Sequence, residues 1–88
     1  MFSIWAKQLD DNNRIIKQDM FHFKQDFSGS LLYVYLQIVC GEWKIETPVV
    51  LKKHIEHFYN FNSVKFRKDD FIDDISFNSL VLEYVEDW

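Results

Sequence analysis

The sequence predicts an α+β fold, in which an antiparallel sheet of about three strands packs against one main helix, with a second short helix beside it. Residues 2–9 and 77–86 alternate apolar and polar side chains with the period of two that is typical of half-buried strands. Residues 27–45 hold enough continuous apolar side chains to form the centre of a core. Residues 51–59 repeat apolar side chains at the spacing of an amphipathic helix. A chain of 88 residues with 48% hydrophobic composition is expected to fold as one domain, residues 1–88.

The first segment predicts a β-hairpin. Within residues 2–9, one set of side chains alternates with another, Phe2, Ile4 and Ala6 against Ser3, Trp5 and Lys7. The short Asp and Asn side chains of residues 10–13 bond locally to the backbone and tolerate a positive φ, which indicates a turn. Residues 14–23 then form the return strand. The last strand, residues 77–86, has one apolar face and is expected to pair with this hairpin.

Residues 27–45 admit two interpretations. As a helix, they present one inward stripe of Leu32, Leu36, Val39 and Trp43, with Asp26 or Ser28 capping the start and Gly41 closing the end in the left-handed conformation. As a strand, the even positions from 32 to 40 form an apolar face, and the Tyr and Val content favours extended structure. The run is longer than a usual strand, and the flanking strands need a helix to cover them, so we favour the helix.

The chain after the main helix contains a break, a helix and two less regular segments. The Thr47-Pro48 pair favours extended backbone. The helix of residues 51–59 is expected to bury Leu51, Ile55, Phe58 and Tyr59 and to expose Lys52, Lys53, Glu56 and His57. Residues 64–67 are predicted to be a brief extended piece, and residues 68–76 a turn or single helical turn that anchors Phe71 and Ile72 inward.

A succession of motifs runs through nearly the whole chain. It comprises a hairpin with Trp5, a helix with Cys40 near its end, Thr47-Pro48-Val49-Val50-Leu51, Phe66-Arg67-Lys68-Asp69-Asp70-Phe71-Ile72, and Phe77-Asn78-Ser79-Leu80-Val81-Leu82-Glu83-Tyr84. This succession resembles a family of small uncharacterised proteins from Firmicutes. The resemblance implies a helix for residues 27–45. Because that family has no assigned activity or site, the resemblance implies no function.

Composition bears on the location of the protein and on its thiol chemistry. One cysteine makes no internal disulfide, and Met1 is followed by no segment with the basic and apolar parts of a secretion signal. No apolar run approaches the length of a membrane span, so we expect a cytoplasmic protein that does not enter a membrane. Cys40 lies in the most apolar run and is expected in the core, where burial raises the pKa of a thiol and suppresses its reactivity.

Charge is unevenly distributed, and this is the most useful indication of function in the sequence. Residues 52–68 carry five Lys or Arg and one Glu, whereas residues 69–88 carry seven Asp or Glu and no Lys or Arg. These adjoining zones suit an unidentified protein partner with a mixed charge pattern, or a second copy of this chain arranged antiparallel. We expect the binding surface on the short helix and its continuation, formed by Lys52, Lys53, His57, Tyr59, Arg67 and Lys68, with Trp5 or Trp43 as further rings.

The basic stretch 52–68 also admits a nucleic-acid interpretation. Its cations are interleaved with aromatic side chains, Phe58, Tyr59, Phe61 and Phe66, and this combination suits a phosphate backbone and stacked bases. Nucleic-acid-binding domains are usually basic, whereas the net charge here is −4. Nucleic-acid binding is therefore the second hypothesis, behind a small non-catalytic protein-interaction module that self-associates or binds another protein.

Catalytic and metal-binding motifs are not recognisable in the sequence. It has no Gly-rich phosphate loop and no nucleophile elbow, and its two glycines offer few places for close backbone approach to a ligand. His54 and His57 lie one helical turn apart, but a metal site needs three or four ligands and no others stand at a recognised spacing. The paired aspartates lack the alternating pattern of a calcium loop. We expect neither an enzyme nor a bound metal or cofactor.

Overall fold

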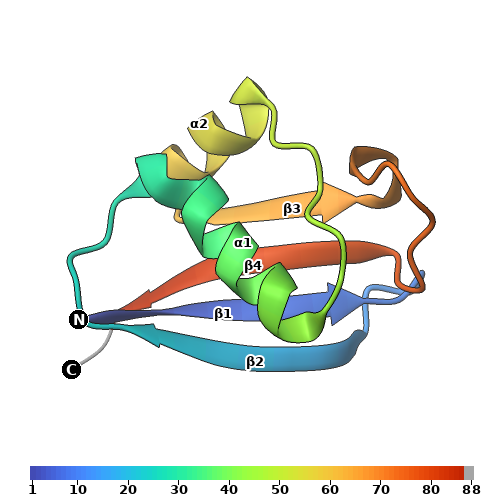
Figure 1. Ribbon diagram of the computed structural model, residues 1–88, viewed down its shortest axis with the longest axis horizontal. Helices are drawn as coiled ribbons and strands as arrows, with labels where there is room; N and C mark the ends of the chain where they lie inside the picture. The colour runs from blue at the N-terminus through green and yellow to red at the C-terminus, as the bar shows by residue number, and fades with distance from the viewer. Residues whose placement is uncertain (87–88) are drawn as a thin grey trace.

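The fold is a four-stranded antiparallel sheet in the order β2-β1-β4-β3, with both helices on one face of the sheet (Figure 1). The structure is a computed structural model that describes residues 1–86. In chain order, the elements are β1 (Phe2–Leu9), β2 (Ile15–Phe23), the 3-10 turn η1 (Gly29–Leu31), α1 (Leu32–Trp43), α2 (Lys52–Phe61), β3 (Ser63–Arg67), the 3-10 turn η2 (Lys68–Asp70) and β4 (Ser79–Glu86). The predicted α+β class, antiparallel sheet and two helices are confirmed. Residues 87 and 88, which end the acidic segment of the sequence, lie outside the described residues.

The predicted number of about three strands is wrong, because β3 is a fourth member of the sheet. The sequence indicated only a brief extended piece over residues 64–67. Residues 63–67 alternate polar and apolar side chains, but so short a run does not by itself predict a strand of the sheet, and β3 gains its place by pairing with β4 further along the chain. In that pairing Val64 lies opposite Leu82 and Phe66 opposite Leu80, and all four side chains are buried. Long-range burial, rather than local propensity, therefore makes this segment a strand.

The hairpin of β1 and β2 forms as predicted, with local hydrogen bonds that explain the turn. The Asp10 carboxylate accepts the backbone N–H groups of Asn12 and Arg14, each at 2.9 Å. The bond from the Arg14 backbone is the main cause that lowers the pKa of Asp10. Asn13 takes the left-handed conformation with φ 61°, which Asn tolerates better than most residues.

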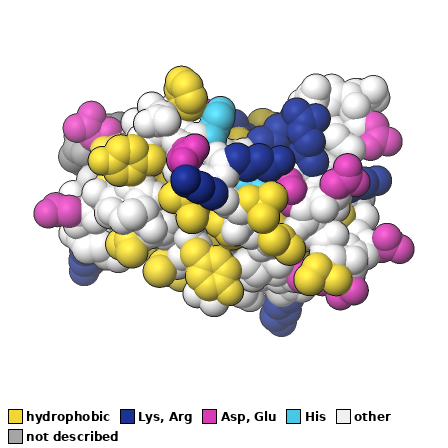
Figure 2. Space-filling model, turned by 90° about the horizontal axis from the view of Figure 1, so that it is seen from above, with side chains coloured by type: hydrophobic (Ala, Val, Ile, Leu, Met, Phe, Trp, Pro, Cys, Tyr) yellow, Lys and Arg dark blue, Asp and Glu magenta, His cyan; other side chains and the backbone are white. Residues whose placement is uncertain are grey.

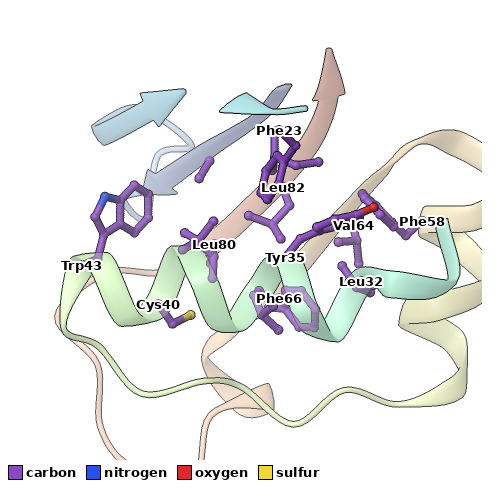
Figure 3. Close-up of a cluster of buried hydrophobic side chains, with 14 of the residues drawn as sticks. Phe23, Leu32, Tyr35, Cys40, Trp43, Phe58, Val64, Phe66, Leu80 and Leu82 are labelled. Carbon is purple, nitrogen blue, oxygen red and sulfur yellow. The ribbon is translucent and has the colours of Figure 1, made fainter. Parts of the chain in front are cut away.

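Helix α1 confirms the helical interpretation of the long apolar stretch. Its predicted inward stripe is buried against the sheet together with Tyr35 and Cys40 (Figure 3). Burial raises the pKa of the Cys40 thiol to about 11, so this residue belongs to the core as expected. The described part of the chain, residues 1–86, holds no helix long and apolar enough to cross a membrane.

The predicted C-terminal closure of this helix at Gly41 is wrong. Gly41 lies inside α1, and Lys44 instead takes the left-handed conformation with φ 57°. The Ile45 N–H then donates to the Cys40 carbonyl at 3.0 Å, which closes the helix in the manner of a Schellman motif. The helix continues beyond Gly41 because Trp43 is buried, and its indole N–H donates to the Asp19 carboxylate on β2 at 2.6 Å.

Candidate binding groove between α2 and β3

Helix α2 and strand β3 lie side by side because the chain reverses sharply between them. Asn62 follows the helix in the left-handed conformation (φ 58°), and β3 begins at the next residue. The helix packs over the strand through the ring of His54, whose centroid is 4.6 Å from that of Phe66. An open groove of about 300 Å³ remains between the two elements, lined by Lys53, His54, His57, Val64, Lys65, Arg67 and Asp70.

A buried histidine forms the floor of this groove. His54 is only 5% exposed, and its Nδ1 accepts the Leu51 backbone N–H at 2.9 Å. Since an N–H group only donates, this bond leaves the ring proton of neutral His54 on Nε2. That nitrogen lies 3.4 Å from Oδ2 of Asp70, and the same oxygen accepts the backbone N–H of Arg67 at 2.9 Å. The His54–Asp70 pair thus joins the start of α2 to the turn that follows β3.

Basic side chains form the rim of the groove from both elements. Lys53 and His57 come from α2, and Lys65 and Arg67 come from β3. His57 Nδ1 lies 2.7 Å from the carbonyl oxygen of Ser63, which accepts, so this bond fixes the orientation of the ring. Of the three fixed cations, Lys53, Lys65 and Arg67, the Lys65 ammonium lies 3.4 Å from Oδ1 of Asn13, and the one carboxylate at the groove, that of Asp70, is already hydrogen-bonded. The arrangement can attract a negatively charged group.

The structure gathers three of the six predicted site residues at this groove, namely Lys53, His57 and Arg67. Lys52 points away and forms a 3.7 Å ion pair with Glu56 on the exposed side of α2. Lys68 lies in η2 and lines hollows beside Asp69 instead.

None of the predicted aromatic side chains lines the groove. The Tyr59 ring lies on the other flank of α2, against Gly29. Trp5 lies on the sheet face opposite the helices, and Trp43 is buried in the core.

Four groove residues, His54, Val64, Lys65 and Asp70, were not predicted as site residues. Lys65 contributed to the basic charge count, but it alternates with the buried Val64 and Phe66, so no local signal assigned it to the groove. Asp70 stood in a run of aspartates that the sequence indicates only as a turn. Its partner His54 is separated from it by the whole of β3, so no local spacing reveals the pair.

The predicted buried face of α2 is wrong for three of its four residues. Phe58 is buried, but Leu51, Ile55 and Tyr59 are exposed and form what we call the apolar stripe. The reason is the position of α2 near the edge of the sheet, where only a narrow line of contact with Phe66, Tyr35 and Phe27 exists. His54 and Phe58 occupy that line, one turn apart. Figure 2 shows the exposed hydrophobic side chains next to the clustered lysine and arginine side chains.

Across residues 1–86, no group of three or more His, Cys, Asp or Glu side chains is placed to hold a metal ion. His54 and His57 bond to different partners, Asp70 and Ser63.

Comparison with known proteins adds no relative, since no protein-family model, curated protein or solved structure matches the chain.

Proposed function

We propose that this chain is a small non-catalytic protein-interaction module whose α2–β3 groove binds an acidic segment of a partner protein. The observation that carries the proposal is the gathering of Lys53, Lys65 and Arg67 around one open groove in a chain of net charge −4. Opposite charge in a partner would steer the encounter and fix its register. A cytoplasmic location, which the single cysteine favours, is part of this proposal.

The surroundings of the groove favour a peptide over a long phosphate backbone. The buried His54 and its partly exposed partner Asp70 form the floor, and the buried Val64 supplies apolar surface there. The apolar stripe on the neighbouring flank of α2 can bury hydrophobic side chains of the same partner. Acidic residues, Asp69 among them, begin immediately beyond the groove and would repel the continuation of a polyanion.

One observation favours nucleic acid as the second candidate. The ring of Phe61 is 66% exposed, and its centroid lies 4.7 Å from that of His57 at the groove. An exposed ring beside cations is a platform on which an unpaired base can stack. A single-stranded oligonucleotide is therefore the competitor that any test of the peptide proposal must include.

The test is an NMR titration of the isotopically labelled protein with two probes, a Glu-rich peptide and an oligo-dT strand. Peptide binding is expected to shift the backbone amides of Lys53, His57, Lys65 and Arg67 and to persist at moderate salt. Binding of the oligonucleotide alone, falling steeply with salt, would make nucleic acid the better proposal.

A matched pair of double variants links binding to the groove. Lys65→Glu with Arg67→Glu reverses two groove charges, and the peptide-induced shifts should disappear. Lys24→Glu with Lys44→Glu makes the same change in net charge on exposed residues outside the groove and should leave the shifts in place. Equal loss in both double variants would mean that net charge, and not this groove, governs binding.

A further inference from the structure

Strand β2 is an edge of the sheet that the rest of the described chain leaves uncovered. It pairs with β1 on one side, and residues 1–86 supply no strand to its other side. Seven of its nine residues are exposed, including Ile16 at 53% and Met20 at 44%. A long edge strand with exposed apolar side chains is a template for pairing with another chain.

The opposite edge of the sheet is much less open. At β3 the outward-facing Ser63 carbonyl is bonded to His57, and the Arg67 N–H is bonded to Asp70. Only a short length of backbone remains there for another strand. The two edges therefore differ, and β2 is the one suited to strand addition.

The pairing of β2 with β1 fixes which side chains share a face. Lys17 lies opposite Gln8, and Asp19 lies opposite Ala6, so both charges are on the helix-covered face. Gln18 and Met20, opposite Lys7 and Trp5, are on the open face. Consequently the charges of β2 occur as a Lys17/Asp19 pair two residues apart on one face.

We propose that β2 pairs antiparallel with β2 of a second copy of this chain, in the register that places Gln18 opposite Gln18. In this register, Lys17 of each copy lies opposite Asp19 of the other, and Ile16 lies opposite Met20. Moving the centre by one residue in either direction sets Lys17 against Lys17 or Asp19 against Asp19. Directly opposed like charges destabilise a strand pair, so the charges favour this register over its two neighbours.

Helix α1 supports the same arrangement. The two-fold axis of such a pair is perpendicular to the sheet, which places the helices of both copies on one face. Ile38 of α1 is 44% exposed and lines a hollow of about 470 Å³ along the outer edge of β2, together with Glu42. Val34, one turn earlier on the same flank, is also exposed. These apolar side chains would meet their counterparts across the axis, adding helix contacts to the strand pair.

A charge-swap experiment tests the register. The Lys17→Asp variant sets two carboxylates against each other at both ends of the pair, and the Asp19→Lys variant sets two ammonium groups against each other there. Each variant alone should dimerise at least about tenfold more weakly than the wild-type chain in sedimentation equilibrium. Their equimolar mixture should recover a heterodimer, because every opposed pair then joins Lys to Asp.

Two controls keep the result interpretable. Lys68→Asp changes the net charge equally at the far edge of the sheet and should leave the dimer unchanged. Far-UV circular dichroism checks folding, since Asp19 also accepts the Trp43 indole N–H. A monomeric wild-type chain at tens of micromolar, or a dimer that survives both single variants, would overturn the proposal.

A crosslink gives a second readout that needs no charge change. In Gln18→Cys the two new thiols face each other across the axis, where directly opposed Cα atoms are about 4.5–5.5 Å apart, within disulfide range. Oxidised glutathione should convert this variant to a covalent dimer faster than Lys24→Cys, whereas the buried Cys40 does not take part. Equal crosslinking rates would argue against this register.

The Lys65→Glu and Arg67→Glu changes of the groove leave β2 intact, so failure of groove binding and failure of dimerisation are separate outcomes.

Discussion

Helices α1 and α2 cover the same face of the same sheet, yet they are held in different ways. α1 crosses the middle of the sheet and buries six side chains, Leu32, Tyr35, Leu36, Val39, Cys40 and Trp43. α2 lies near the β3 edge and buries two, His54 and Phe58. Burial of apolar surface therefore fixes α1, whereas it fixes only one narrow line of α2.

Polar contacts compensate for the small contact area of α2. The Val49 N–H, just before the helix, donates to the Asp70 carbonyl at 2.7 Å. The Glu46 carboxylate accepts the Ile72 N–H at 3.0 Å, and His54 adds its bonds to Leu51 and Asp70. A helix anchored in this way keeps both flanks exposed, one for the basic groove and one for the apolar stripe. On this comparison, α1 contributes most of the apolar burial, and α2 carries the surface that we propose for binding.

The largest expected effect is on the free energy of unfolding when one aliphatic side chain is truncated in each helix, because the two losses should differ. Leu36 is fully buried on α1, so Leu36→Ala should lower the free energy of unfolding by about 2–5 kcal/mol. Ile55 is exposed in the apolar stripe of α2, so Ile55→Ala should cost about 1 kcal/mol or less. Urea unfolding followed by tryptophan fluorescence measures both. Similar losses for the two variants would show that the apolar stripe is covered in solution.

The next effect tests the polar anchoring of α2. His54→Phe retains a ring against Phe66 but leaves the Leu51 N–H and the Asp70 carboxylate without this partner, at an expected cost of about 1–3 kcal/mol. The amide of Leu51 should also exchange faster with solvent, which a loss of packing alone would not explain. His57→Phe is the matched control, because His57 is exposed at the rim of the groove. If both variants lose equal stability, the His54–Asp70 pair is not the anchor.

The same comparison explains how much could be predicted from sequence. The buried stripe of α1 was predictable because Gln37, Gly41 and Lys44 mark the opposite side of the helix, even though Val34 and Ile38 add exposed apolar side chains on one flank. In α2, the candidates for the buried face are Ile55 with Tyr59 and His54 with Phe58. The spacing of apolar residues does not predict that a histidine is buried in preference to an isoleucine. The contact between His54 and Asp70 joins residues on either side of β3, and the pairing of β3 with β4 holds that strand in place. The groove was partly predictable, since the charge count included Lys53, Lys65 and Arg67 but gave no sign of the buried His54 beneath them.

A smaller effect comes from the two glycines, which have opposite surroundings. An added Cβ at Gly41 on α1 meets no atom within 4 Å, so Gly41→Ala should stabilise the protein by about 0.5–1 kcal/mol. At Gly29 the added Cβ would lie 3.0 Å from Cα of Tyr59, so Gly29→Ala must displace the backbone of α2 and should destabilise by about 1 kcal/mol. Thermal unfolding distinguishes the two signs. A neutral Gly29→Ala would mean that α2 moves outward without loss, and its anchoring would then be weaker than argued above.

The smallest expected effect concerns the loop that ties the segment before α2 to residues 72 and 73. A hydrogen bond between the side chains of Glu46 and Asp73 raises the pKa of Asp73 and lowers that of Glu46. The Asp73 contribution to stability is therefore full below its unfolded pKa and is lost as pH rises through the raised value, whereas the Glu46 contribution is lost as pH falls through the lowered one. Asp73→Asn keeps a donor toward Glu46 at every pH and removes the repulsion between two carboxylates.

The Asp73→Asn variant should therefore have a higher Tm than the wild-type chain at neutral pH. The difference should shrink on acidification, once Asp73 of the wild-type chain takes up its proton. Asp74→Asn, one residue further on, removes the same charge without the bond to Glu46 and serves as the control. Thermal unfolding between neutral and acidic pH measures all three chains. A pH-independent gain shared by both variants would reflect net charge alone, and the anchoring of α2 would then rest on His54, Asp70 and Val49 without a contribution from Glu46.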